Sequence, residues 1–108
     1  MIYELRTYTA TLDKMPDLLA RFRDHTLKIF ERHGIKSIGY WTNSIGGRND
    51  ELVYIVAFDD IAQRDAAWAA MGADEEWLKV RGESNKDGNI VHHLTNQIMI
   101  PTDFSPLS

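Results

Sequence analysis

Cysteine is absent from this sequence. Disulfides, thiolate metal sites and a cysteine nucleophile are therefore excluded, and the absence is compatible with the reducing cytoplasm, where we expect the protein to lie. No apolar run approaches the roughly 20 residues that a membrane-spanning helix needs. The first residues also lack the basic region and apolar core of a secretory signal. We therefore expect neither a membrane span nor secretion.

An excess of positive charge is lacking as well. The 108 residues include 12 Lys and Arg against 16 Asp and Glu, which gives a formal net charge of −4. Such a chain has no electrostatic footprint for nucleic acid, so we expect no nucleic-acid partner. Its 44% hydrophobic and 26% charged residues are typical of an ordinary globular protein. The length fits one domain, which we place over residues 1–108.

Four strands are predicted, and the third is the most informative. Residues 52–58 are apolar at nearly every position, so both faces of this strand should be covered and the strand should lie inside a sheet. The loop before it is rich in Gly and Asn, which favours a hairpin with the second strand. Pro101 ends the last strand. The predicted strands span residues 2–9, 35–42, 51–58 and 89–100.

A long amphipathic helix is predicted between the first two strands. Either Thr11 or Asp13 can cap its start, and Gly34 is expected to end it in the left-handed conformation. Apolar residues recur at three- and four-residue steps along one face. Side chains on the opposite face, among them Arg21 and Asp24, are expected to be solvated.

Two further helices are predicted after the third strand, over residues 61–71 and, capped by Asp74, over residues 75–83. The order βαββαβ predicts an α+β, ferredoxin-like fold, in which an antiparallel four-stranded sheet carries helices on one face and strands one and three are central. The apolar outer face of the third strand then needs a cover. A second copy packed sheet to sheet supplies one, so we expect a homodimer.

Three short motifs then suggest a family. They are Tyr3-Glu-Leu-Arg-Thr-Tyr8, Gly39-Tyr-Trp-Thr42, and the apolar strand leading into Asp59-Asp60 with Arg64 and Trp68. In this order and combination, over nearly the whole chain, the sequence resembles the NIPSNAP family. The resemblance implies a dimeric α+β barrel. Relatives in that superfamily include small monooxygenases without metal or flavin, heme-degrading enzymes and chlorite dismutase-like proteins, whereas NIPSNAP members mostly have no assigned reaction.

The sharpest chemical pattern is Glu4, Arg6 and Tyr8, which share one face of the first strand. We expect Tyr3 and Leu5 to face the helices and this polar row to lie on the other face. One interpretation is an anion or carbonyl site, with Arg6 as a bidentate donor and Tyr8 as a hydroxyl donor. The alternative is a structural Glu4–Arg6 ion pair, within the chain or across a dimer.

His92 and His93 lie on opposite faces of the last strand, so only one of them can join the face of Arg6. We take His92 as the candidate general acid or base, because the pKa of a histidine is near neutrality. The alternative is a partly buried histidine bonded to backbone or to a tyrosine. Adjacent strand residues diverge and no carboxylate stands at ligand spacing, so we expect neither a metal nor another cofactor.

Aromatic residues are numerous for a small chain. Tyr40, Trp41, Tyr54 and Trp68 are candidate walls of a pocket for a flat apolar substrate; the alternative is core or dimer interface. Two hypotheses remain. The first is a small-molecule binding protein or enzyme, with monooxygenase-like or isomerase-like chemistry and no cofactor. The second is a non-catalytic protein-interaction module.

Overall fold

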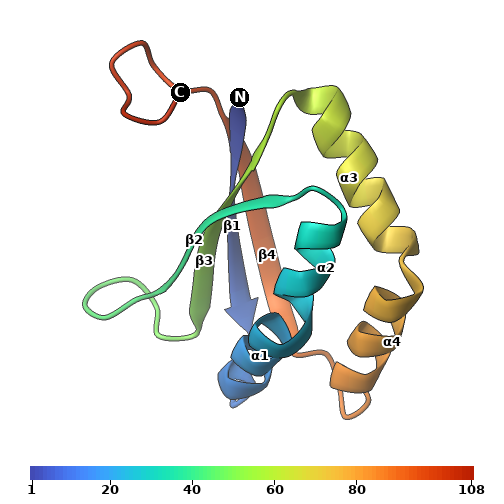
Figure 1. Cartoon of the computed structure of the whole chain (residues 1–108). Helices are drawn as coiled ribbons and strands as arrows, with labels where there is room; N and C mark the ends of the chain where they lie inside the picture. The colour runs from blue at the N-terminus through green and yellow to red at the C-terminus, as the bar shows by residue number, and fades with distance from the viewer.

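The strands of the computed structural model, which describes residues 1–108, form one antiparallel sheet in the order β2-β3-β1-β4 (Figure 1). β1 and β3 are therefore central, and the ferredoxin-like α+β prediction is confirmed. All helices lie on the same face of the sheet (Figure 1). The strands are β1 Ile2–Ala10, β2 Lys36–Thr42, β3 Glu51–Phe58 and β4 Val91–Met99.

The first predicted helix is divided into three segments, α1 Met15–Arg21, the π-helical η1 Phe22–Thr26 and α2 Leu27–Arg32. In η1 the hydroxyl of Thr26 donates to the carbonyl oxygen of Arg21 at 3.3 Å. Periodicity alone does not predict such an interruption, because the apolar stripe continues on both sides of it. The remaining helices are α3 Ile61–Ala73 and α4 Glu75–Ser84.

The predicted caps of the first helix are wrong. α1 begins at Met15 without a side-chain cap. The hydroxyl of Thr11 donates instead to the carbonyl of Asn89 at 2.6 Å, and Asp13 adopts a positive φ of 65° in the preceding turn. The left-handed Gly34 after α2 is confirmed, with φ of 72°.

The face assigned to the polar row of β1 is also wrong. Glu4 is paired with Val56 and Arg6 with Tyr54, and these β3 side chains belong to the core beneath the helices. Glu4, Arg6 and Tyr8 therefore face the helices. The prediction failed because unpaired charges are too costly for a core, whereas this carboxylate is completely paired, as described below.

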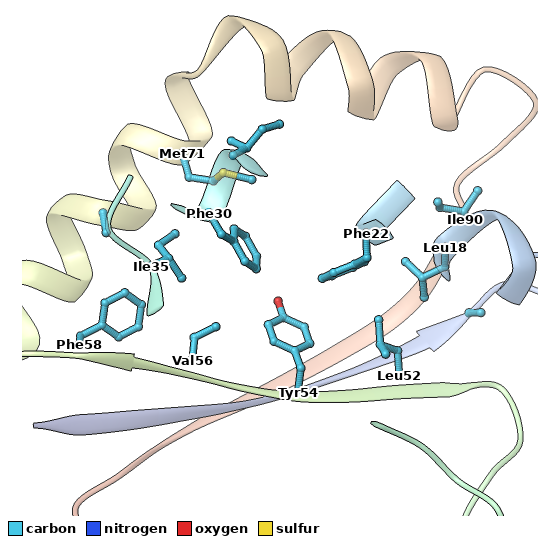
Figure 2. Close-up of a cluster of buried hydrophobic side chains, with 13 residues drawn as sticks. Leu18, Phe22, Phe30, Ile35, Leu52, Tyr54, Val56, Phe58, Met71 and Ile90 are labelled. Atoms are coloured by element: carbon cyan, nitrogen blue, oxygen red, sulfur yellow. The ribbon is translucent and has the colours of Figure 1, made fainter. Parts of the chain in front are cut away.

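The core lies between the sheet and the helices (Figure 2). Phe22 and Phe30 of the helices pack on Tyr54 of the sheet. The ring centroid of Tyr54 lies 5.3 Å from that of Phe22 and 6.1 Å from that of Phe30. Figure 2 shows the Tyr54 hydroxyl directed towards the helices. Each large apolar side chain buried here contributes roughly 1.5–3 kcal/mol to folding.

The opposite face of the sheet carries no helix. Leu5, Val53 and Ile55 are only partly buried there, and Trp41 is 50% exposed. The edge strand β4 is exposed from His92 to Ile98. No helix combines the length and apolar character needed to cross a bilayer.

Candidate functional site

Glu4 is a charged residue inside the core, with 0% of its surface exposed. Its carboxylate accepts five hydrogen bonds from four side chains. Arg6 Nη1 donates at 2.7 Å and Trp68 Nε1 at 2.9 Å. Arg64 donates at 2.9 and 3.3 Å, and Asn96 donates from β4 at 3.0 Å. Both carboxylate oxygens are fully hydrogen-bonded, so Glu4 holds the side chains around it in position.

The ionisation of Glu4 follows from these contacts. Burial raises the pKa of a carboxyl group, but the hydrogen bonds from Arg64, Trp68, Asn96 and Arg6 outweigh it and lower the pKa of Glu4 from 4.5 to about 2. Glu4 is therefore an anion at neutral pH and a weak proton acceptor. It holds Arg6 in place and does not act as a general base.

Arg6 extends this network towards the helices. Its Nε donates to the hydroxyl of Tyr54 at 2.8 Å, and its Nη2 donates to the hydroxyl of Tyr8 at 3.2 Å. The guanidinium carbon lies 4.5 Å from the ring centroid of Trp68, within range of a cation–π contact. Burial lowers the pKa of Arg6, yet the tyrosine oxygens and Glu4 raise it above its ordinary value. The cation is thus fixed in position and permanently charged.

A cavity of about 170 Å³ adjoins Arg6 between the sheet and the helices. Its polar end is formed by Arg6 and Tyr8, and no carboxylate or imidazole lines it. The other lining residues, most of them apolar and from η1, α2, α3 and α4, are Phe22, Thr26, Phe30, Trp68, Met71, Gly72 and Trp77. π-Helical turns such as η1 recur at functional sites. The cavity is an aromatic chamber with a cation and a phenol at one end.

The hydroxyl of Tyr8 has unused hydrogen-bonding capacity at the polar end of this cavity. It accepts hydrogen bonds from Arg6 Nη2 and, at 3.1 Å, from the hydroxyl of Tyr54. Both of its lone pairs are used, and no acceptor within the protein takes its proton. Since Tyr8 lines the cavity, that proton is available to an acceptor placed there.

The predicted site residues divide into two groups. Glu4, Arg6, Tyr8, Tyr54 and Trp68 are brought together as described, and Tyr40 joins them through a stacked contact with Tyr54 at 5.2 Å between ring centroids. Trp41 and His92 are not brought there. Trp41 pairs with Val53 in the sheet and lies on the open face. His92 is exposed beside a register shift of β4 and makes no hydrogen bond to the Arg6 network.

Sequence reasoning missed part of the site. Arg64 and Asn96 complete the coordination of Glu4, and Phe22 and Phe30 supply cavity walls. Asn96 shares the predicted face of the last strand with His92, which was a usable signal. Within the whole chain, no group of three or more His, Asp or Glu side chains is arranged to hold a metal ion.

The arrangement favours one kind of chemistry. A carbonyl or oxyanion at the polar end would accept the Tyr8 proton beside a fixed positive charge, and negative charge developing on that oxygen would be stabilised. Proton abstraction from carbon would need a base, and the lining residues offer none. The lining thus offers hydrogen-bond donors and a fixed cation, and no base.

Comparison with known proteins identifies the family to which the chain is similar. The family model described as NIPSNAP matches residues 3–106. Mouse protein NipSnap homolog 3B is 35% identical over 75 residues, which cover 69% of this chain and 30% of that protein. A NIPSNAP family protein of unknown function from Agrobacterium tumefaciens superposes with a TM-score of 0.86 at 33% identity, over 100% of this chain and 94% of that one.

A more distant match concerns the fold alone. A solved antibiotic biosynthesis monooxygenase has a TM-score of 0.62 and 14% identity, over 94% of this chain and 99% of that one. The ferredoxin-like architecture is therefore shared beyond the relatives that carry the NIPSNAP name.

Proposed function

The chain belongs to the NIPSNAP family, and we propose that it binds a small organic molecule carrying a carbonyl or oxyanion in the cavity beside Arg6. The observation that carries the proposal is the proton of Tyr8, which has no acceptor in the protein and faces the cavity. A phenol held by two donors is restricted in orientation, so its own proton is directed towards whatever occupies the cavity.

The size of the cavity limits the ligand. A closed apolar space of about 150 Å³ accommodates a benzene-sized molecule, and this cavity measures about 170 Å³. Its walls include Phe22, Phe30 and Trp77, whose faces and edges suit a flat ring. The ligand class is therefore a single-ring or short-chain compound with one oxygen acceptor at one end.

Any turnover would follow from polarisation of that oxygen. Tyr8 and Arg6 would stabilise the oxyanion of a ligand that enters already ionised, such as a phenolate, and such an anion can react directly with molecular oxygen without a cofactor, whereas the lining offers no base to form an enolate from a neutral ketone. Tyr8 is the donor and Arg6 the fixed cation, while Glu4 positions Arg6. His92 has no part in this scheme, since it is exposed outside the cavity.

A matched pair of probes tests the binding site. Acetophenone carries a ring and a carbonyl, whereas ethylbenzene has the same ring without the acceptor. We expect acetophenone to bind more tightly in NMR titrations, and Tyr8→Phe to weaken it by about 3- to 10-fold, because a neutral hydrogen bond contributes about 0.5–1.5 kcal/mol. Tyr3→Phe is the control, since Tyr3 bonds the carbonyl of Ser108 and does not line the cavity.

Equal affinity for the two probes, or equal loss of affinity in both tyrosine variants, would refute the carbonyl site.

Retention of a native ligand is a second, independent test of the binding site. Native mass spectrometry of the freshly purified protein, before and after denaturation, should release a reproducible small molecule.

The proposed assembly is a homodimer formed by the open face of the sheet. Leu5, Val53 and Ile55 are partly buried in a single chain, and a second sheet packed against them would remove their apolar surface from water. Ile55→Lys should give a monomer in sedimentation equilibrium. Ile45→Lys, on a loop residue that is 97% exposed, should leave the assembly unchanged. A wild-type monomer would contradict this part of the proposal.

The second candidate function is a non-catalytic interaction module. The completed hydrogen bonding of Glu4 favours it, because a closed ion-pair network is expected of a structural device. The two candidates differ in the probe titration. A module without a ligand site should show no saturable change at Tyr8 or Trp77 with either probe.

A further inference from the structure

Arg21 closes α1 and is a second cation inside the molecule, with 7% of its surface exposed. Its expected solvated position is wrong, because the π-helical turn and α4 enclose it. Nη1 donates to the hydroxyl of Ser84 at 3.2 Å, and the guanidinium carbon lies 5.1 Å from the ring centroid of Trp77. Nε is buried and has no hydrogen-bond partner.

No carboxylate compensates this charge. Glu4, the buried anion of the chain, is already bonded to Arg6 and Arg64, and none of the ion pairs includes Arg21. A buried cation without an anion, and a buried N–H without an acceptor, both cost free energy in the folded state. Such a group calls for an explanation, and an anionic ligand bound at the guanidinium would provide the compensating charge.

Arg21 also lines an open cleft of about 520 Å³ between the first helical segments and α4. Nη2 of Arg21 makes no hydrogen bond within the protein. Among the unpartnered nitrogens of Arg21 only Nε is buried, so Nη2 is accessible to solvent in the cleft. The cleft therefore has a guanidinium group at its floor.

Acidic side chains around this cleft are exposed at its rim. Asp17, Glu76 and Glu83 each have a basic partner of their own, at 3.8 Å from Lys14, 3.2 Å from Arg32 and 3.0 Å from Lys86 respectively. Asp24 and Asp87 also line the cleft, as do Lys79 and His25. Exposed charges are screened by water, whereas a buried charge acts through a lower dielectric. Water therefore weakens the rim charges more than it weakens the charge of Arg21.

Arg81 adds to the positive potential near Arg21. Burial is the main cause that lowers the pKa of the Arg21 guanidinium, and the charge of Arg81 acts in the same direction. The positive charge of Arg81, which does not itself line the cleft, therefore favours an anion beside Arg21.

We propose that the cleft between α1, η1 and α4 is a second ligand site, in which the accessible end of Arg21 binds the carboxylate of a small organic acid. The acidic rim selects the kind of anion. A monoanionic carboxylate meets less repulsion from Asp24 and Asp87 than a phosphate dianion does. Trp77 lines the inner cavity and its ring lies against the guanidinium of Arg21, so one side chain connects the two sites.

An NMR titration of the wild-type protein tests the site directly. The buried Arg21 Nε–H gives a side-chain resonance that can be followed while sodium acetate, inorganic phosphate or sodium chloride is added at equal ionic strength. We expect a saturable shift of this resonance with acetate, a weaker one with phosphate and none with chloride. A phosphate response stronger than that of acetate would overturn the carboxylate assignment, and no saturable response to any anion would overturn the site.

Two variants separate a ligand role from a structural one. Arg21→Met keeps side-chain length and removes the charge, so we expect it to abolish acetate binding while the melting temperature stays the same or rises. Arg23→Met is the matched control, because Arg23 is exposed and does not line the cleft. Unchanged acetate binding by Arg21→Met would refute the proposal. Tyr8→Phe should leave acetate binding at Arg21 intact, which distinguishes this site from the inner cavity.

Discussion

Replacement of Glu4 by glutamine is the most direct test of how the core tolerates its charges. Glu4→Gln keeps the side-chain shape but presents an amide to five hydrogen bonds that are all directed at a carboxylate. Arg6 and Arg64 then lose their shared anion. Breaking a buried ion pair by removing one partner costs about 3–5 kcal/mol.

The pKa gives an independent magnitude. The fall in the pKa of Glu4 from 4.5 to about 2 corresponds to roughly 3 kcal/mol, at about 1.4 kcal/mol per pH unit. Because the folded-state pKa is depressed, this stabilisation is present above pH 4.5 and is lost as the pH falls towards 2. We therefore expect Glu4→Gln to lower the free energy of unfolding by about 3 kcal/mol at pH 7, with a smaller difference near pH 2.

Urea denaturation at several pH values measures this difference, with the m-value checked for constancy. Glu83→Gln is the control, since the exposed Glu83 pairs only with Lys86 and should leave the midpoint nearly unchanged. A loss below about 1 kcal/mol at pH 7, set against the figures above, would refute the reasoning. So would a loss that stays the same from pH 7 to pH 2.

Three further substitutions test other parts of the fold. Tyr54→Phe leaves Arg6 Nε without its acceptor at 2.8 Å, so the free energy of unfolding in urea should fall by about 1–3 kcal/mol. Asp60→Ala removes the side-chain oxygen that accepts from the backbone N–H of Gln63 at 2.8 Å, and calorimetry should show a loss of about 1 kcal/mol. Gly47→Ala, at φ of 68° and with its new Cβ 2.7 Å from the Asn43 side chain, should cost about 1–2 kcal/mol. Gly46→Ala also has a positive φ, of 81°, but open space around it, so a larger loss there would contradict the steric argument.

The sequence was sufficient for the order of elements and the strand arrangement. The apolar run of β3 predicted a central strand, and β3 lies between β2 and β1. The left-handed Gly34 and the capping Asp74 followed from local chemistry, and Asp74 accepts from the backbone N–H of Trp77 at 2.9 Å. These features depend on residues close in the chain, where propensity and capping act directly.

The candidate site was only partly predictable, because it depends on contacts between distant residues. The rule that charges avoid a core placed Glu4 on the wrong face of β1. Its partners Arg64 and Asn96 follow it by 60 and 92 residues. No local sequence pattern predicts that residues so far apart contact the same carboxylate. Arg21 was misplaced for a related reason, since a helical wheel does not show that α4 will cover the polar side of α1.

The strand order also determines when each strand pair can form during synthesis. Tyr3 pairs with Met99 and Glu4 is completed by Asn96, so of the four strands the one synthesised first lies beside the one synthesised last. At roughly 5–20 residues per second of synthesis, Glu4 waits on the order of 5–20 seconds for that partner. Closing so long a loop is slow relative to local helix formation. The pairing of β1 with β4 and the bond from Asn96 to Glu4 therefore become possible only after β3, Arg64 and Trp68 have been synthesised.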